Sequence, residues 1–165
     1  MIIGGIAVIA RGVVRQTDDI DATIWADQAP LPRLLECLAK QGISGRIPDL
    51  EAFARDNQVL LLRHDETGTP MEVTLAWLPF EREALDRADI LPLGHVKAPV
   101  SSAEDLIIYK AIAWRDRDRT DIQRLFRAHH SSLDVERIKR VVGEFAAALD
   151  EPERVGELEK LIRRA

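Results

Sequence analysis

Three acidic residues have types and spacing suited to holding a metal ion. Asp19 and Asp21 are one residue apart in the segment QTDDIDATIW, and Glu72 lies in MEVTLAW. Alternation of polar and apolar residues predicts that both segments are strands, so the two aspartates would share one strand face. Two neighbouring carboxylates repel each other unless a cation lies between them, and Mg²⁺ accepts such hard oxygen ligands. We therefore predict a divalent-cation site at Asp19 and Asp21, which Glu72 completes if its strand is adjacent.

Each of these acidic residues also has a simpler interpretation. A D-x-D pair on one strand is typical of a solvated face. Glu72 would be satisfied by an ion pair with Arg63 or Arg82, because an unpaired charge on a half-buried surface is costly. The residues alone leave both alternatives open.

A glycine pair, Gly4-Gly5, precedes a short apolar segment that reads as a turn entering a helix. Glycine lets the backbone approach phosphate oxygens, and the N–H groups at the start of a helix hydrogen-bond them. Carboxylates that hold two metal ions, beside a backbone that holds phosphates, suit phosphoryl or nucleotidyl transfer. The alternative is a tight turn with nothing bound.

A second group of charged residues lies in SSAEDLIIYKAIAWRDRDRTDIQRLF. Helical spacing predicts one helix that carries Lys110, a break near 115–118, and a further helix. Asp118 and Asp121 would cap the start of that further helix, and Lys110 would extend from an apolar helix to solvent. The alternating arginines at the break would form a solvated face or a local basic patch for an RNA acceptor.

The remaining segments predict an α/β front half followed by a helical tail. We expect one unit made of an α/β core at 1–100 and a packed helical part at 101–165. Within the core we expect helices at 30–42, 48–57 and 78–89, a hairpin from VLLLRH and MEVTLAW, and short strands at 90–100. Two amphipathic helices separated near 151–152 would complete the tail.

Composition limits the class of protein. An apolar fraction of 46% and a charged fraction of 31% over 165 residues describe an ordinary globular protein. The formal net charge of −5 means that the surface as a whole would not attract nucleic acid. The single cysteine, Cys37, excludes a disulfide within the chain, and we expect it in the core. The apolar run at 2–10 is too short to span a bilayer and no Lys or Arg precedes it, so we expect a cytoplasmic protein.

Together these blocks resemble a known family. The order G-G, D-x-D and a third acid on a later strand resembles the nucleotidyltransferase fold of the polymerase-beta superfamily. More narrowly, GGIAVIARGVVRQTDDID and SSAEDLIIYKAIAWRDRDRTDIQRLF are similar to AbiEii-type nucleotidyltransferases of abortive-infection and toxin–antitoxin systems. The resemblance implies an α/β (α+β) fold in which helices flank a small mixed sheet, with a helical C-terminal part.

The resemblance also implies an activity and residue roles. The activity is Mg²⁺-dependent transfer of a nucleoside monophosphate from an NTP, with release of pyrophosphate, at a two-metal site. Asp19, Asp21 and Glu72 would be metal ligands, although aspartate is commoner than glutamate at the last position. The residues implied in binding the triphosphate are Gly4, Gly5, Arg15, Thr17 and Lys110, and Lys110, Asp118 and Asp121 would complete the catalytic set.

The implied partners follow from the same resemblance. The acceptor would be RNA, such as tRNA, or a protein hydroxyl, and a toxin would have a cognate antitoxin. The family usually has a helix before the glycine pair, and apolar surface left bare without it would favour a homo-oligomer or a partner protein. Two other functions stay open: a nucleotidyltransferase for small molecules such as antibiotics, and a catalytically idle binding module, which Glu72 in place of aspartate favours.

Overall fold

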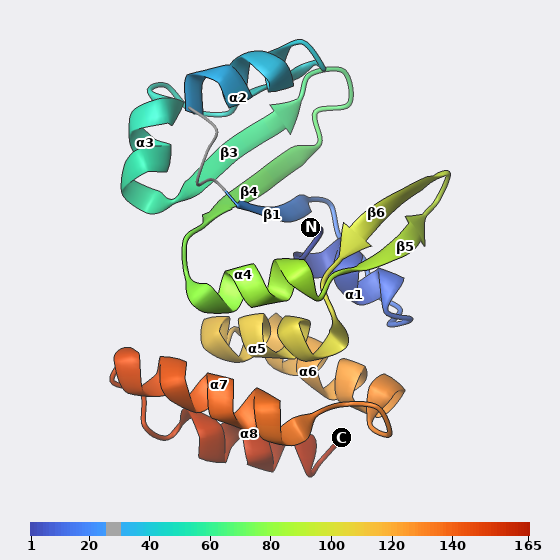
Figure 1. Ribbon diagram of the computed structural model, residues 1–165. Helices are drawn as coiled ribbons and strands as arrows, with labels where there is room; N and C mark the ends of the chain where they lie inside the picture. The colour runs from blue at the N-terminus through green and yellow to red at the C-terminus, as the bar shows by residue number, and fades with distance from the viewer. Residues whose placement is uncertain (26–30) are drawn as a thin grey trace. The chain divides into compact units, whose positions relative to one another are not determined.

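The computed structural model describes residues 1–25 and 31–165. Eight helices and six strands lie in these ranges, which makes the fold mixed α/β as predicted (Figure 1). The chain divides into two compact units, residues 1–7 with 16–101 and residues 8–15 with 102–165. We call them the α/β unit and the helical unit, and each is described by itself.

The α/β unit is built on a four-stranded mixed sheet with the order β1-β4-β3-β2. β1 (Ile20–Trp25) runs parallel to β4 (Pro70–Ala76). β3 (Val59–His64) pairs antiparallel with β4, which confirms the predicted hairpin, and with β2 (Ile43–Gly45) on its other side. β2 was not predicted, because three residues are too few to show an alternating pattern.

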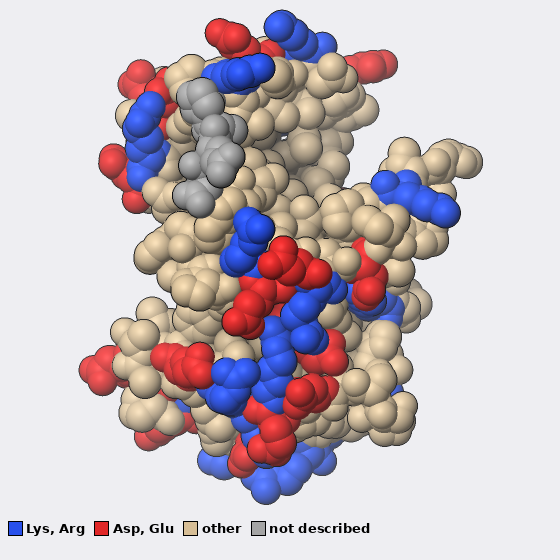
Figure 2. All heavy atoms as spheres, viewed as in Figure 1, with Lys and Arg blue, Asp and Glu red and all other residues tan. Residues whose placement is uncertain are grey.

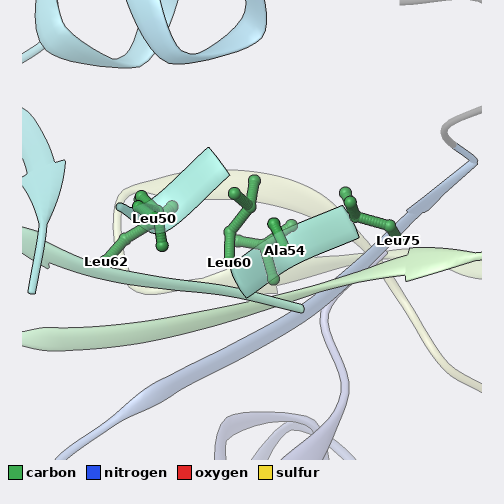
Figure 3. Close-up of a cluster of buried hydrophobic side chains, with 6 residues drawn as sticks. Leu50, Ala54, Leu60, Leu62 and Leu75 are labelled. Carbon is green, nitrogen blue, oxygen red and sulfur yellow. The ribbon is translucent and has the colours of Figure 1, made fainter. Parts of the chain in front are cut away.

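The core of this unit lies on one face of the sheet, under α3 (Leu50–Asn57). Figure 3 shows Leu50 and Ala54 of the helix above Leu60, Leu62 and Leu75 of the strands. Leu60 and Leu62 are almost completely buried, and the burial of each such side chain contributes about 1.5–3 kcal/mol. The face that carries Asp21 and Glu72 is therefore the opposite one, because side chains alternate along a strand.

α2 (Leu31–Ala39) packs on the same core through four leucines that are only partly buried, Leu31, Leu34, Leu35 and Leu38. The predicted start of this helix at residue 30 lies outside the described residues. Cys37 is exposed, so the expectation of a core cysteine was wrong. The reason is its position on the helix, outside the apolar stripe that the leucines form.

The first residues of the chain connect two sheets. Ile2 bridges to Ala22 of β1 and to Val100, and the Ile3 N–H donates to the Asp21 carbonyl at 2.9 Å. Val100 ends β6 (Val96–Val100), which pairs antiparallel with β5 (Asp89–Leu93) in a separate two-stranded sheet. The pairing of Ile2 and Ile3 with β1 brings the following residue, Gly4, beside Asp21.

Two helices of the α/β unit remain to be placed. α1 (Gly4–Ala10) begins directly after this paired segment, as the glycine pair predicted, and its last residues belong to the helical unit. α4 (Pro79–Asp86) follows β4 and begins with Pro79 at its first position, where proline is favoured.

The helical unit contains α5 (Ala103–Ala113), α6 (Asp116–His129), α7 (Val135–Ala148) and α8 (Arg154–Ile162). α5 packs against α6 and α7, and α8 packs against the same two helices (Figure 1). Both predicted tail helices are therefore present and lie on either side of the expected break. No helix in the described ranges is both long enough and apolar enough to span a membrane.

The break between α5 and α6 lies at Trp114 and Arg115, at the start of the predicted range. Trp114 has a φ of 52°, in the left-handed region, and its N–H donates to the Lys110 carbonyl at 2.8 Å. The guanidinium groups of Arg154 and Arg119 lie 4.7 Å and 5.9 Å from its ring centroid. These cation–π contacts help to hold a backbone conformation that is unfavourable for tryptophan.

Candidate functional site

The Asp21 carboxylate packs directly against Gly4. Gly4 has a φ of 60°, and a Cβ added there would overlap Oδ2 of Asp21. Glycine is therefore needed at this position both for the left-handed backbone and for the space. Gly5, the second residue of α1, is buried. A carboxylate at the first turn of a helix is also favoured by the partial positive charge of the helix N-terminus.

Thr17 and Asp19 lie just before β1 rather than in it. The Thr17 hydroxyl donates to Oδ1 of Asp19 at 2.7 Å, and both residues are partly buried. The expected strand therefore begins one residue after Asp19. Thr17 was predicted to bind phosphate. In the structure its hydroxyl orients the Asp19 carboxylate.

Glu72 lies beside Asp21 on the neighbouring strand. The two residues are register partners in the parallel β1–β4 pair, so both side chains are on the same face of the sheet. The prediction of Glu72 as a third carboxylate required the two strands to be adjacent, and they are. Glu72 forms an ion pair, but with Arg46 at 2.9 Å rather than with Arg63 or Arg82.

The resemblance implies a divalent cation, which needs several oxygen ligands. Asp19 and Asp21 supply hard carboxylate oxygens, and the bare α-carbon of Gly4 leaves the space that the Asp21 carboxylate occupies. In residues 1–25 and 31–165, no three His, Cys, Asp or Glu side chains are grouped so as to hold a metal ion. Two aspartates with substrate oxygens and water fit the usual coordination of Mg²⁺. The role of Glu72 as a metal ligand stays a prediction.

Arg15, Lys110 and Asp121 lie together in the helical unit. The Lys110 ammonium is 2.7 Å from Oδ2 of Asp121, and the Arg15 guanidinium is 2.6 Å from the same oxygen. All three side chains are largely buried. Lys110 therefore does not extend to solvent, and its predicted contact with phosphate stays untested.

Asp118 extends this network to Arg115. Its Oδ1 is 3.3 Å from the Lys110 ammonium, and its Oδ2 accepts from the side chain and the N–H of Arg115 at 2.7 and 3.1 Å. Burial would raise the pKa of Asp118, but the hydrogen bond from Arg115 and the positive charges of Lys110 and Arg115 together lower it below its usual value. Asp118 also caps α6, as the simpler interpretation expected, whereas Asp121 pairs with Arg15 and Lys110 and does not cap the helix.

The predicted site residues thus form two groups, one in each unit. Gly4, Gly5, Thr17, Asp19, Asp21 and Glu72 belong to the α/β unit, and Arg15, Lys110, Asp118 and Asp121 belong to the helical unit. That the two groups act in one site stays a prediction.

Sequence reasoning missed Arg46 and the role of Arg115 as a partner of Asp118. Arg46 is 26 residues from Glu72 along the chain. It follows β2, the strand that had no recognisable pattern, so no sequence signal placed it on this sheet. Arg115 had a signal, its three-residue spacing to Asp118, which is the spacing of neighbours on a helix.

The charge on the surface is mixed. On the face drawn in Figure 2, Lys and Arg side chains are interspersed with Asp and Glu. In the segment at 115–119, Arg119 pairs with Asp116 and Arg115 pairs with Asp118. The predicted local basic patch is therefore partly neutralised by its own aspartates.

Comparison with known proteins places the chain in a family. A search of curated proteins found no match. The model of one family, DUF6036, described as "Nucleotidyltransferase of unknown function", matches residues 1–163. This match covers nearly the whole chain and agrees with the mixed α/β fold. The chain belongs to this family of nucleotidyltransferases of unknown function.

Proposed function

We propose that this protein is a Mg²⁺-dependent nucleotidyltransferase that moves a nucleoside monophosphate from an NTP to an acceptor hydroxyl. The proposal rests on the Asp21 carboxylate, which packs on Gly4 at the start of α1. Asp21 is also the register partner of Glu72 on the neighbouring strand. A phosphate that approached this point would be repelled by Asp21 unless a cation lay between them. The site is thus suited to a cation bound together with phosphate.

The chain's own residues have defined tasks in this reaction. Asp19 and Asp21 would hold Mg²⁺, which when bound neutralises phosphate charge and lowers the pKa of the acceptor hydroxyl. Thr17 fixes the Asp19 carboxylate through its hydrogen bond. The acceptor oxygen forms a bond to the α-phosphorus, the bond to the β-phosphate oxygen breaks, pyrophosphate leaves with that electron pair, and the hydroxyl proton passes to solvent.

For the acceptor we propose an RNA end, such as that of tRNA, or a protein hydroxyl, with a toxin role in a toxin–antitoxin pair. The support is the likeness of the two blocks at 4–21 and 101–126 to AbiEii-type proteins. A small-molecule acceptor is the alternative, and the net charge of −5 favours it. Binding of RNA would weaken steeply with added salt, whereas transfer to a neutral small molecule would not.

One observation favours a second candidate, a catalytically idle binding module. Glu72 is held by Arg46, so the third carboxylate of the predicted metal site is already paired. An idle module would keep the fold and bind neither Mg²⁺ nor NTP.

The test is incubation of the purified protein with Mg²⁺, each α-labelled NTP in turn, and total bacterial RNA. The control is the double variant Asp19→Asn, Asp21→Asn, which keeps the side-chain shape and removes both charges. We expect label in RNA or protein only with the unaltered chain. No label with any NTP, together with no stabilisation by Mg²⁺ and NTP, would instead support the idle module.

A further inference from the structure

We propose that Arg46 competes with the divalent cation for the Glu72 carboxylate, so that Glu72 binds one or the other. This inference rests on the proposed function, because it requires a cation at Asp19 and Asp21. It assigns a role to Arg46, which lies outside the set of residues that the sequence predicted.

The competition begins with two like charges on neighbouring strands. Asp21 and Glu72 are register partners on β1 and β4, which lie about 4.8 Å apart, and their side chains are on one face. Two carboxylates that are close together repel each other, because each disfavours the charged form of the other. A positive charge beside Glu72 relieves this repulsion, whether it comes from a side chain or from an ion.

Arg46 supplies that charge across an intervening strand. Its N–H donates to the Leu61 carbonyl at 2.9 Å, and Leu61 is the register partner of Glu72 on β3. From this anchored backbone its guanidinium reaches past Leu61 to Oε1 of Glu72 at 2.9 Å. The backbone contact holds Arg46 in place when the side-chain contact opens.

The Arg46–Glu72 pair is open to exchange. The Arg46 side chain is 30% exposed and that of Glu72 is 49% exposed, so water reaches both. Ion pairs of this kind are weak, because the side chains are already solvated and lose freedom when they pair. A divalent cation held nearby by Asp21 carries twice the charge of a guanidinium and can displace it. The half-exposed pair is therefore a switchable contact, unlike the buried Lys110–Asp121 pair.

The experiment is titration with Mn²⁺ alone, without nucleotide, followed by electron paramagnetic resonance of the free ion. Mn²⁺ accepts the same carboxylate ligands as Mg²⁺. The variants are Arg46→Gln, Glu72→Gln, the double variant of these two, and Asp19→Asn with Asp21→Asn. The matched control is Arg63→Gln, which removes the same charge from an exposed residue two positions from Leu61 on β3.

We expect Arg46→Gln to tighten Mn²⁺ binding about threefold, the factor expected for release of one exposed ion pair. Glu72→Gln should weaken binding and abolish the effect of Arg46→Gln, while Arg63→Gln should leave the Kd nearly unchanged. Equal effects of Arg46→Gln and Arg63→Gln, or no effect of either, would overturn the inference. In that case, loss of Mn²⁺ binding in the Asp19→Asn, Asp21→Asn variant would still support the metal site at these two aspartates. Absence of Mn²⁺ binding in every variant would overturn both the inference and the proposed metal site.

Discussion

At the level of single residues, the contact between Gly4 and Asp21 joins the two sequence motifs that predicted a cation and phosphate site. Gly4 has a left-handed backbone and no space for a Cβ, because the Asp21 carboxylate fills it. The sequence predicted both residues as site residues from a glycine pair and a D-x-D pattern. It did not show that the glycine makes room for the aspartate, because that contact depends on the pairing of Ile3 with β1.

Gly4→Ala should lower the free energy of unfolding by about 1–3 kcal/mol, the usual cost of a strained backbone with an added clash. Asp21→Gly in the same chain should recover part of this loss, because it removes the overlapping carboxylate. Urea unfolding of the two single variants and the double variant measures the coupling. Gly156→Ala in α8 is the control, since a Cβ there meets nothing. Strictly additive effects of the two substitutions would contradict the contact.

At the scale of elements, a buried charge network joins the segment at 8–15 to α5 and α6 in the helical unit. Arg15, Lys110 and Asp121 form its centre, and Asp118 links it to Arg115. Buried ions lose their hydration, so such a network tolerates the loss of a partner poorly. The segment at 8–15 belongs with these helices, although the predicted boundary placed it in the front half.

Lys110→Met should destabilise the helical unit by about 3–5 kcal/mol, because it leaves two buried carboxylates with fewer cations. The measurement is chemical unfolding followed by helical circular dichroism. Lys160→Met, at an exposed position of α8, should change stability by less than about 0.5 kcal/mol. A similar small effect at both positions would mean that the network contributes little to stability.

Asp118 gives the helical unit a pH dependence on the acid side. Its pKa is lowered in the folded chain, because the hydrogen bond and charge of Arg115 and the charge of Lys110 outweigh the effect of burial. The resulting stabilisation is complete above the unfolded pKa of about 4 and is lost as pH falls through the lower folded pKa. The difference in unfolding free energy between the unaltered chain and Asp118→Asn should therefore shrink below about pH 4. A difference that stays constant from neutral to acid pH would contradict this assignment.

Sequence patterns predicted most elements, and the reason is local periodicity. The hairpin at 59–76, the break after α5 and the two tail helices all follow from patterns within one segment. The misses concern contacts that are distant along the chain or elements too short to show a period. β2 has three residues, and the Arg15–Asp121 pair joins residues that are 106 apart. The candidate site residues were therefore predicted by type and spacing, while the contacts of Glu72 with Arg46 and of Asp121 with Arg15 were not.

At the scale of the whole molecule, the two groups of predicted residues belong to different compact units. The α/β unit carries the carboxylates suited to a cation, and the helical unit carries a network with more cationic than acidic members, Arg15, Lys110 and Arg115 against Asp118 and Asp121. A triphosphate needs both a metal ion and compensating positive charge. That the cations of the helical unit compensate triphosphate charge in the proposed reaction stays a prediction.

Mg²⁺ with the correct NTP should raise the melting temperature of the unaltered chain, because a ligand that binds only the folded state stabilises it. At a ligand concentration about 100-fold above the Kd, the gain is about 2.7 kcal/mol. Differential scanning fluorimetry with each NTP in turn would identify the base. The Asp19→Asn, Asp21→Asn variant should show no such rise, and an equal rise in that variant would place NTP binding elsewhere.

Whether Asp21 holds the ion that the transfer requires can be measured by exchanging its oxygen ligand for sulfur. Asp21→Cys replaces a hard oxygen ligand with a thiolate, which prefers softer ions such as Cd²⁺. The work belongs in a Cys37→Ser background, because Cys37 is exposed and would bind the same ion. We expect Asp21→Cys to release no pyrophosphate from NTP with Mg²⁺ and to regain release with Cd²⁺, while Asp21→Asn stays inactive with both ions. Undiminished release by Asp21→Asn with Mg²⁺ would contradict this expectation.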